Sequence, residues 1–478
     1  MAIHVDEVTA GHEPLDQPPP RAAGERPATP WWRRVHWGLL IVLVVAAVPR
    51  WLWLDYARPE PVSDFKHYLD AAVNLVDAGF LGIGTPSAWR LPAFPAFLAV
   101  GILFTRDTFF LSAFTVALTV AQVGLTYWLA WLVFRRRFAA FVAGLAAAIA
   151  PAFVVFAPVL ASEHLLAVFV LGALIAAMKA GGRMRWWMAA LSGVLLGAGV
   201  LTRGEAGAYL PAILLVVGVG AWKAARTRRV LTTLGACALV VAGLALVVMP
   251  WIIRNETVVG EGTGLSTTGG FNFYLAHSPG PYGWRTPLPL PLQVEDEVLR
   301  NEFAWRYGLQ YVRDHPEDWV PTMREGTREL LAPSSYAAFY ATVFDDHVHS
   351  VLQTRDDLGV RDDAISLAGR SSRWLLWAGL VGLLLAPVWR TRAWLAVVGI
   401  TLANWVVYAV IFWAQARYRF VVDALACVAV GAVPATLAAT TSWVNGGWPE
   451  RKSVPAREEA MRGTRQVAPG ADPAQREL

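Results

Sequence analysis

The sequence is short of charged residues. Only 16% of its 478 residues are Asp, Glu, Lys or Arg, whereas about 25% is usual for a soluble domain. With 56% hydrophobic residues and a mean hydropathy of +0.43, too little polar surface remains to cover several water-soluble domains. The composition therefore excludes a soluble multidomain enzyme and indicates a polytopic membrane protein. The 23 tryptophans agree with this, because Trp favours the boundary between lipid and headgroups.

Cysteine is nearly absent, and one long stretch has no lysine and more acidic than basic residues. Cys237 and Cys427 both lie inside apolar runs, so no disulfide framework is implied. Residues 254–373 contain 11 Arg, no Lys and 17 acidic residues. Twelve other basic residues crowd into four short loops: Arg135, Arg136 and Arg137; Lys179, Arg183 and Arg185; Lys223, Arg226, Arg228 and Arg229; Arg390 and Arg392. Such sorting is typical of membrane topology, and no nucleic-acid partner is expected.

Ten apolar runs approach the roughly 20 residues that a membrane-spanning helix needs. They are residues 37–54, 109–134, 138–158, 164–180, 186–202, 206–222, 230–252, 374–389, 393–413 and 420–440. The four basic loops fall on the side of the N-terminus, which the positive-inside rule makes cytoplasmic. The sequence therefore predicts an all-α polytopic protein of the cell membrane, with about ten spans and both termini in the cytoplasm.

The predicted domain organisation follows these spans. Residues 1–34 and 441–478 are predicted to be disordered cytoplasmic tails, and the first 30 residues are rich in Pro and charged residues without an apolar period. The remaining parts are an N-terminal transmembrane catalytic module at 35–254 with an amphipathic first outer loop at 55–108, a small outer-face segment at 255–373, and C-terminal transmembrane helices at 374–440. Residues 91–104 are apolar but short and are interpreted as an interfacial or re-entrant helix.

Two carboxylates on the predicted outer face are candidates for proton transfer. Asp64 opens a stretch of helical spacing that should lie flat on the membrane, and it can take a proton from a hydroxyl if burial raises its pKa. Glu163, between Ser162 and His164, lies where the chain turns between two apolar helices. Ionisable groups at that depth in a membrane are usually functional. For both carboxylates the alternative interpretation is a helix cap or a first-turn acid.

Arginines recur at the outer ends of the predicted helices: Arg90, Arg203, Arg254, Arg417 and Arg419. The planar guanidinium group fits phosphate oxygens with two parallel hydrogen bonds, so five at one face suit a lipid phosphate or pyrophosphate. Anchoring to headgroups is the alternative for one or two of them. The glycine-rich segment 260–273 lacks the strand and helix of a nucleotide motif. Residues 345–349 hold two Asp and two His but have no identifiable distant partner, so no metal site is predicted.

With these residues in place, the sequence resembles the GT-C integral-membrane glycosyltransferases, of the protein O-mannosyltransferase and lipid A aminoarabinose transferase type. Five blocks between about residue 37 and residue 440 carry the resemblance. They are Asp64 followed by Tyr68; Arg-Leu-Pro-Ala-Phe-Pro at 90–95, similar to the family's Arg-x-Pro-Gly-Tyr-Pro; Trp-Ile-Ile-Arg-Asn at 251–255 with Gly260, Ser266, Thr267, Gly269, Gly270 and Asn272 at the family's intervals; Tyr-Val-Arg-Asp-His-Pro at 311–316; and Arg-Tyr-Arg at 417–419.

The resemblance implies transfer of a sugar from a polyprenyl-phosphate donor to a glycan, lipid or protein acceptor on the extracytoplasmic face. It implies Asp64 as the general base and Glu163 as a second acid, with no cofactor besides the lipid-linked sugar and no metal. The residues implied to hold the donor phosphate are Arg90, Arg203, Arg417 and Arg419. The implied substrate loop consists of Lys66, His67, Tyr68, Arg254, Asn255 and Asn272.

Two other functions stay open from the sequence. A ligase or polymerase of lipid-linked glycans would also use outer arginines and a carboxylate, but on a pyrophosphate-linked oligosaccharide. A lipid-sugar flippase or transporter would place charged residues near the middle of the bilayer, where this sequence has almost none.

Overall fold

The computed structural model describes residues 36–61, 63–183, 185–225, 227–285, 287–332, 355–385, 387 and 389–446. The N-terminal tail predicted at 1–34, most of the C-terminal tail predicted at 441–478 and the Asp/His segment 345–349 lie outside these residues. The chain divides into two units, residues 1–37 and residues 38–478, and everything that follows concerns the second unit.

Every regular element in the described residues is a helix, and no strand occurs among them. The main α-helices are α2 (Trp37–Ala57), α3 (Ser63–Ala78), α4 (Ala93–Ile102), α5 (Thr108–Phe134), α6 (Arg137–Ile149), α7 (Pro151–Phe156), α8 (Ser162–Arg183), α9 (Trp186–Thr202), α10 (Leu210–Ala224), α11 (Arg229–Val258), α12 (Gly269–Ala276), α13 (Glu297–Asp314), α14 (Trp319–Leu331), α16 (Arg355–Leu384), α17 (Thr391–Trp405), α18 (Phe420–Val430) and α19 (Ala432–Gly446). Shorter elements are the 3₁₀ turns η1 (Gly204–Tyr209) and η6 (Ala416–Arg419) and the π-helical turn η5 (Val406–Ile411). The all-α fold class expected from composition is confirmed.

Seven helical stretches in the described part of the chain are long and apolar enough to cross a membrane. They are Trp37–Ala57, Thr108–Phe134, Ser162–Ala180, Gly204–Ala224, Arg229–Val258, Thr391–Ile411 and Ala416–Thr441. Three of the ten predicted spans are not in this set, because residues 138–158 form two short helices, 186–202 form a helix of only 17 residues, and 374–389 lie partly in the charged helix α16. The count of ten is therefore not confirmed.

The predicted span 138–158 is broken by a proline. Pro151 starts α7, as proline favours the first helical position, and α6 ends at Ile149. The carbonyl oxygens of Ala147 and Ala148 near this end accept hydrogen bonds from the guanidinium group of Arg50, at 3.0 and 2.7 Å. Arg50 is fully buried in α2 and thus supplies partners for backbone groups that lipid cannot satisfy.

Helices α9 and α11 pack closely through glycines. A Cβ atom on Gly193 would lie 2.0 Å from the carbonyl oxygen of Val240, and one on Gly243 would lie 2.4 Å from that of Ala190. Small residues allow helix backbones to approach each other in this way. The close packing fixes the relative position of two helices that end beside the cavity described next.

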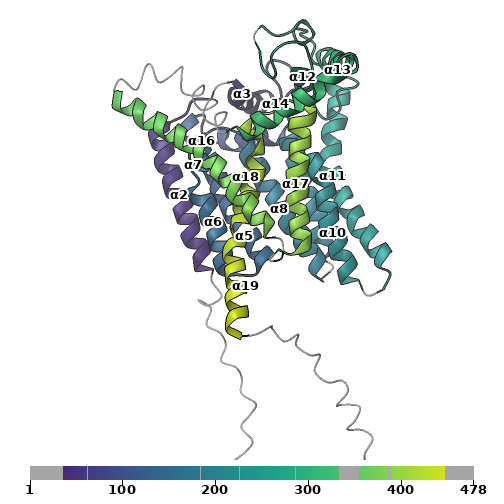
Figure 1. The fold of residues 1–478 in the computed structure, drawn as a ribbon. Helices are drawn as coiled ribbons and strands as arrows, with labels where there is room; N and C mark the ends of the chain where they lie inside the picture. Colours follow the sequence, from purple (N-terminus) through teal and green to yellow (C-terminus); the bar gives the residue numbers. More distant parts are fainter. Residues whose placement is uncertain are drawn as a thin grey trace, which may run out of the picture. The chain divides into compact units, whose positions relative to one another are not determined.

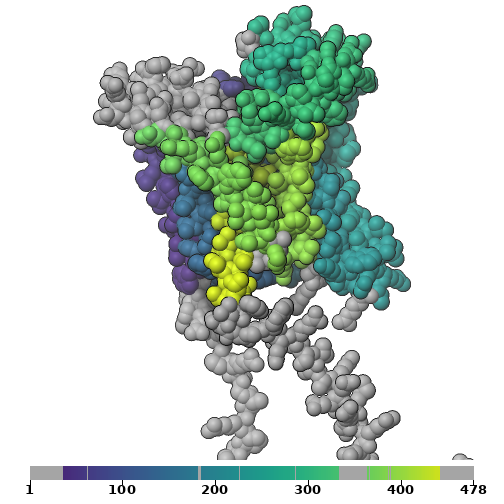
Figure 2. All heavy atoms as spheres, viewed as in Figure 1, coloured from purple at the N-terminus to yellow at the C-terminus, as the bar shows by residue number. Residues whose placement is uncertain are grey.

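Helices α3, α12, α13 and α14 gather at one end of the long apolar helices (Figure 1). Figure 2 shows the segment that carries α12–α14 (green) beyond the ends of these helices. The starts of α3 and α8 and the ends of α9 and α11 all lie toward this end. The fold therefore brings together chain segments that are far apart in the sequence.

Candidate functional site

A cavity of about 520 Å³ lies where the ends of the apolar helices meet α3 and α12. Its polar lining includes Ser63, Asp64, His67, Tyr68, Arg90, Thr202, Arg203, Glu205, Thr268, Asn272, Gln415 and Arg417. Its aromatic lining is Trp89, Phe271, Trp284, Trp413 and Tyr418. Seven of the predicted site residues therefore line one cavity, although they are far apart in the sequence. They are Asp64, His67, Tyr68, Arg90, Arg203, Asn272 and Arg417.

Asp64 lies in the first turn of α3 and is held by two arginines. One carboxylate oxygen accepts a hydrogen bond from Arg90 Nη2 at 2.6 Å, and the other accepts one from Arg417 Nη2 at 2.7 Å. The Asp64 side chain remains 30% exposed. Burial by itself would raise the pKa of the carboxyl group, but the charges of Arg90 and Arg417 outweigh it and hold the pKa well below its ordinary value. Ser63, just before it, has a φ of 50°, a strained backbone of the kind found at functional sites.

Arg203 forms a second node beside Asp64. Its Nη1 donates to Glu163 Oε1 at 3.0 Å, and its Nε pairs with Glu205. Arg417 Nη1 lies 3.6 Å from the same Glu163 oxygen, which links the two nodes. Three guanidinium groups thus face three carboxylates, and the cluster has no net charge before a ligand enters.

Two tyrosines, Tyr408 and Tyr418, contact these arginines. Arg203 Nη2 donates to the Tyr408 hydroxyl at 3.1 Å, and Tyr408 lies in the π-helical turn η5, an irregularity that is frequent at functional sites. The guanidinium carbons of Arg203 and Arg417 lie 4.7 and 5.1 Å from the centre of the Tyr418 ring, which gives cation–π contacts. The arginines are therefore fixed in position and are ready to meet an anion.

His67 and Tyr68 flank Arg90. Arg90 Nη2 lies 3.1 Å from His67 Nδ1, and burial together with the charge of Arg90 lowers the pKa of the imidazole. A neutral imidazole can accept a hydrogen bond from Arg90 at that nitrogen. The Tyr68 hydroxyl lies 3.1 Å from Ser162 Oγ, and Arg90 lies 5.1 Å above its ring. These contacts hold Arg90 against Asp64.

Glu163 and Arg419 do not belong to the cavity lining in the described part of the chain. Glu163 is buried behind Arg203 and Arg417 and contacts them. Arg419 is 1% exposed: its Nε donates to Asp423 at 3.1 Å, its Nη2 donates to Ser372 Oγ at 2.9 Å, and its Nη1 bonds to the Leu330 carbonyl oxygen. Arg419 thereby ties α14, α16 and α18 together and does not line the cavity.

Three other residues of the predicted substrate loop, Lys66, Arg254 and Asn255, bond to parts of the chain outside the cavity lining. Lys66 pairs with Asp70 on the exposed side of α3. Arg254 Nη1 donates to the Ser87 carbonyl oxygen at 3.0 Å, and Asn255 Nδ2 donates to that of Gly264 at 3.0 Å. The Arg-Asn pair of the third sequence block therefore shapes the loops around the cavity without lining it.

Asn272 lies in the cavity wall and also holds an aromatic neighbour. Its side-chain oxygen accepts a hydrogen bond from Trp413 Nε1 at 2.9 Å. Sequence reasoning missed the lining residues Glu205, Tyr418 and Trp89, although each stands one or two positions from a predicted arginine. Adjacency to those arginines was the signal that could have found them.

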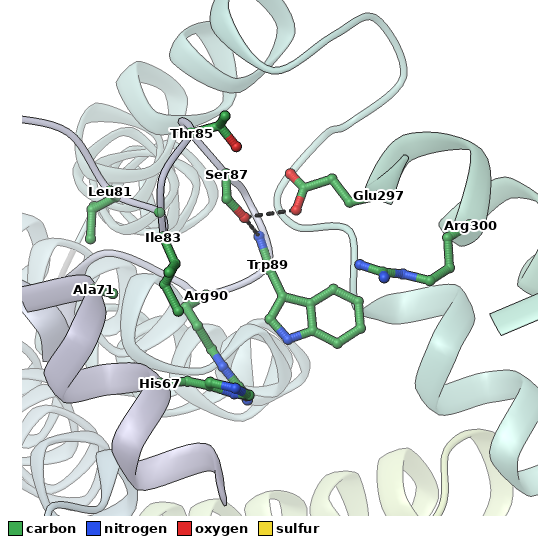
Figure 3. Close-up of a pocket in the computed structure, with 11 residues that line it drawn as sticks. His67, Ala71, Leu81, Ile83, Thr85, Ser87, Trp89, Arg90, Glu297 and Arg300 are labelled. Atoms are coloured by element: carbon green, nitrogen blue, oxygen red, sulfur yellow. Dashed lines mark hydrogen bonds between the residues drawn. The ribbon is translucent and has the colours of Figure 1, made fainter. Parts of the chain in front are cut away.

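A second cavity, of about 390 Å³, adjoins the first and shares His67, Trp89 and Arg90 with it (Figure 3). Its far wall carries Glu297 and Arg300 of α13. Glu297 accepts hydrogen bonds from Ser87 Oγ at 2.7 Å and from the Ala88 amide at 2.8 Å. Arg300 lies 4.3 Å from the centre of the Trp89 ring. The indole thus forms a fixed flat surface between the two cavities.

The main cavity is suited to binding an anion, because Arg90, Arg203 and Arg417 line it. No group of three or more His, Cys, Asp or Glu that could hold a metal ion occurs among the described residues.

Acidification is expected to remove the stabilising effect of Asp64. Its pKa in the folded protein lies below that of an Asp in an unfolded chain, which is about 3.9. The ion pairs of Asp64 therefore stabilise the fold above about pH 4, and this contribution is lost as the pH falls toward the lower folded value. Thermal unfolding from about pH 6 to about pH 3 should show the stability gap between wild type and Asp64→Asn narrowing. Asp70→Asn on the exposed side of α3 should not reproduce that pattern, and a constant gap for Asp64→Asn would contradict the expectation.

Comparison with known proteins gives a likeness of structure. No family model and no curated protein matches the sequence. Among solved structures, the archaeal oligosaccharyltransferase AglB from Archaeoglobus fulgidus, in complex with an inhibitory peptide and a dolichol-phosphate, is similar over 87% of this chain and 53% of its own, at 15% identity and a TM-score of 0.47. ArnT from Cupriavidus metallidurans bound to undecaprenyl phosphate is similar over 87% of this chain and 79% of its own, at 17% identity and a TM-score of 0.36.

The chain spans about half the length of the oligosaccharyltransferase that it matches. The function proposed next rests on the side chains of the cavity.

Proposed function

We propose that the protein is a membrane glycosyltransferase that moves a sugar from a polyprenyl-phosphate donor to a hydroxyl group of an acceptor on the extracytoplasmic face. The observation that supports this is Asp64, held between Arg90 and Arg417 in a cavity at the ends of membrane-length apolar helices. In that position a polyprenyl chain can stay in the bilayer while its phosphate and sugar enter the cavity. The protein is then a multi-pass protein of the cell membrane with both termini in the cytoplasm.

The proposed reaction is a displacement at the anomeric carbon of the donor sugar. The acceptor oxygen forms a bond to that carbon, and the bond from the carbon to the phosphate oxygen breaks. The electron pair of the broken bond goes to the phosphate, where Arg90, Arg203 and Arg417 stabilise the added charge. The proton of the acceptor hydroxyl goes to the carboxylate of Asp64.

The low pKa of Asp64 has a role in this scheme. In the empty site Asp64 is a weak base, because Arg90 and Arg417 stabilise its ionised form. A donor phosphate competes for the same guanidinium groups and takes their hydrogen bonds. Asp64 then loses its partners, and its pKa rises toward the range in which a carboxylate accepts a proton effectively. Proton transfer thus becomes favourable only when the donor is bound.

Other residues of the cluster act by position. Glu163 contacts Arg203 and Arg417 from behind, so it orients the phosphate-binding groups. The second cavity lies on the other side of Arg90 and carries the flat Trp89 surface, so we assign the acceptor to it. A glycan, a lipid or a protein can supply the acceptor hydroxyl group.

Reconstitution with defined donors tests this function. Purified protein is supplied with radiolabelled polyprenyl-phosphate monosaccharides or pyrophosphate-linked oligosaccharides, together with a membrane extract as the source of acceptors. We expect label to reach acceptors from a monosaccharide phosphate with wild type, and not with Asp64→Asn. Transfer from the oligosaccharide pyrophosphate alone would instead indicate a ligase or polymerase. Absence of transfer while labelled lipid crosses the bilayer would indicate a flippase and overturn the proposal.

A further inference from the structure

A second cluster of cations lies at the opposite ends of α8 and α9 from the Asp64 site. Ser162, at the start of α8, contacts Tyr68 in that site, and α9 ends there at Thr202. The other end of α8 and the start of α9 meet near Arg185. Helices of this length extend about 25–33 Å, so the two clusters stand on opposite sides of the predicted membrane.

The second cluster lines a cavity of about 610 Å³. Its walls come from the end of α5, the end of α8 and the starts of α9 and α17. Its lining consists of Trp131, Leu132, Arg135, Met178, Lys179, Arg185, Arg390 and Arg392. Five of these eight side chains are cations and none is acidic, in contrast to the balanced cluster around Asp64.

The cations of this cavity lack counterions within the described part of the chain. None of the five forms an ion pair with a described residue. Arg392 Nη2 donates to the Met178 carbonyl oxygen at 3.1 Å, while its Nη1 is buried and has no hydrogen-bond partner there. Burial and the nearby charge of Arg135 lower the pKa of Arg390. Close like charges and an unsatisfied buried donor both cost free energy, which an anion in the cavity would recover.

Topology alone does not explain this convergence. The positive-inside rule accounts for basic residues on this side, and Arg228 and Arg229 are examples that are exposed on the surface. Those two do not line the cavity. The distinguishing features of this open cavity are its five cations, none of which forms an ion pair with a described residue, and the buried Nη1 of Arg392, which has no hydrogen-bond partner there.

We propose that this cavity binds a phosphate group, carried either by an acidic phospholipid or by a soluble phosphate compound. Guanidinium groups match phosphate oxygens in geometry and charge, and Arg390 and Arg392 line the cavity together with Arg135. Trp131, Leu132 and Met178 add apolar wall that suits the part of a lipid next to its headgroup. The site is separate from the Asp64 cavity and does not depend on the proposed transferase activity.

Lipid retention tests the first source of the phosphate. The full-length protein is placed in nanodiscs of phosphatidylcholine with or without phosphatidic acid and is then examined by native mass spectrometry. If the phosphate belongs to a lipid headgroup, we expect wild type to retain phosphatidic acid. The Arg390→Gln/Arg392→Gln variant should bind this lipid at least about tenfold more weakly. The matched control, Arg228→Gln/Arg229→Gln, removes the same charge from the same side and should retain the lipid as wild type does.

Inorganic pyrophosphate, added in discs of phosphatidylcholine alone, tests the second source. For a soluble phosphate, it should raise the unfolding temperature of wild type and of the control, and not that of Arg390→Gln/Arg392→Gln. Should the Arg392 substitution prevent folding, Arg185→Gln/Arg390→Gln removes two exposed cations of the same cavity and must show the same loss. A selective effect in either arm supports the phosphate site and identifies its source. Equal behaviour of the cavity variant, the control and wild type in both arms would overturn the proposal.

Discussion

Replacing Asp64 by asparagine is expected to lower the sugar-transfer rate by about 10²- to 10⁴-fold while the donor binds more tightly. The rate falls because an amide cannot accept the proton of the acceptor hydroxyl. Donor binding tightens because Asp64 competes with the phosphate for Arg90 and Arg417, and a neutral amide competes far less. About a tenfold lower dissociation constant is expected for polyprenyl phosphate, measured by direct binding beside single-turnover transfer.

The opposite movement of rate and affinity distinguishes this role from a structural one. Asp70→Asn provides the matched control, because Asp70 lies in the same helix and pairs with the exposed Lys66. It should leave both quantities unchanged. A parallel loss of transfer and donor binding in Asp64→Asn would show that Asp64 only maintains the cavity. Undiminished transfer would place the base elsewhere, with Glu205, the other carboxylate in the cavity lining, as the next candidate.

Replacing Arg419 by glutamine is expected to destabilise the fold by about 3–5 kcal/mol and to leave the donor affinity of the folded protein intact. Arg419 and Asp423 are both almost fully buried, so the substitution leaves a buried carboxylate without its cation. It also removes hydrogen bonds to Leu330 and Ser372, which connect α14 and α16 to the start of α18. Denaturant unfolding in detergent measures the loss, and polyprenyl-phosphate titration of the folded fraction measures affinity.

Arg417→Gln is the matched comparison for Arg419→Gln. Arg417 stands two positions before Arg419 but contacts Asp64 and Glu163 and lines the cavity. Its substitution should abolish high-affinity donor binding even in protein that remains folded. If Arg419→Gln weakened donor binding as strongly as Arg417→Gln does, the result would support the predicted phosphate-binding role of Arg419.

The sequence predicted Asp64, Arg90, Arg203 and Arg417 at one face from their places near the ends of apolar runs, and the four residues line one cavity in the structure. It did not identify which groups pair, since hydropathy leaves the rotation of each helix undetermined. Arg417 and Arg419 illustrate this limit. They lie in a 3₁₀ turn with three residues per turn, so side chains two positions apart point in different directions. An unbroken helix was expected to start just after them, and nothing in the residue pattern revealed the turn.

The number of membrane spans could not be predicted exactly for a related reason. A hydropathy window counts residues 138–158 as one span, although Pro151 marks the break that α6 and α7 display. The buried Arg50 carries the complementary information, because its partners are the carbonyl oxygens near that break. It could not be matched to them without the packing of α2 against α6. Long-range partners of this kind depend on the tertiary arrangement rather than on local sequence.

The position of Asp64 between two of the arginines proposed to hold the phosphate has a consequence for salt sensitivity. In the proposed reaction the phosphate gains one negative charge at the moment when Asp64 takes up a proton and loses one. The total charge of the occupied site thus stays constant during chemistry, and surrounding ions need not rearrange. Total charge changes only when a charged ligand enters or leaves. Ionic strength should therefore act on KM for the donor and on product release, and leave the chemical step largely unaffected.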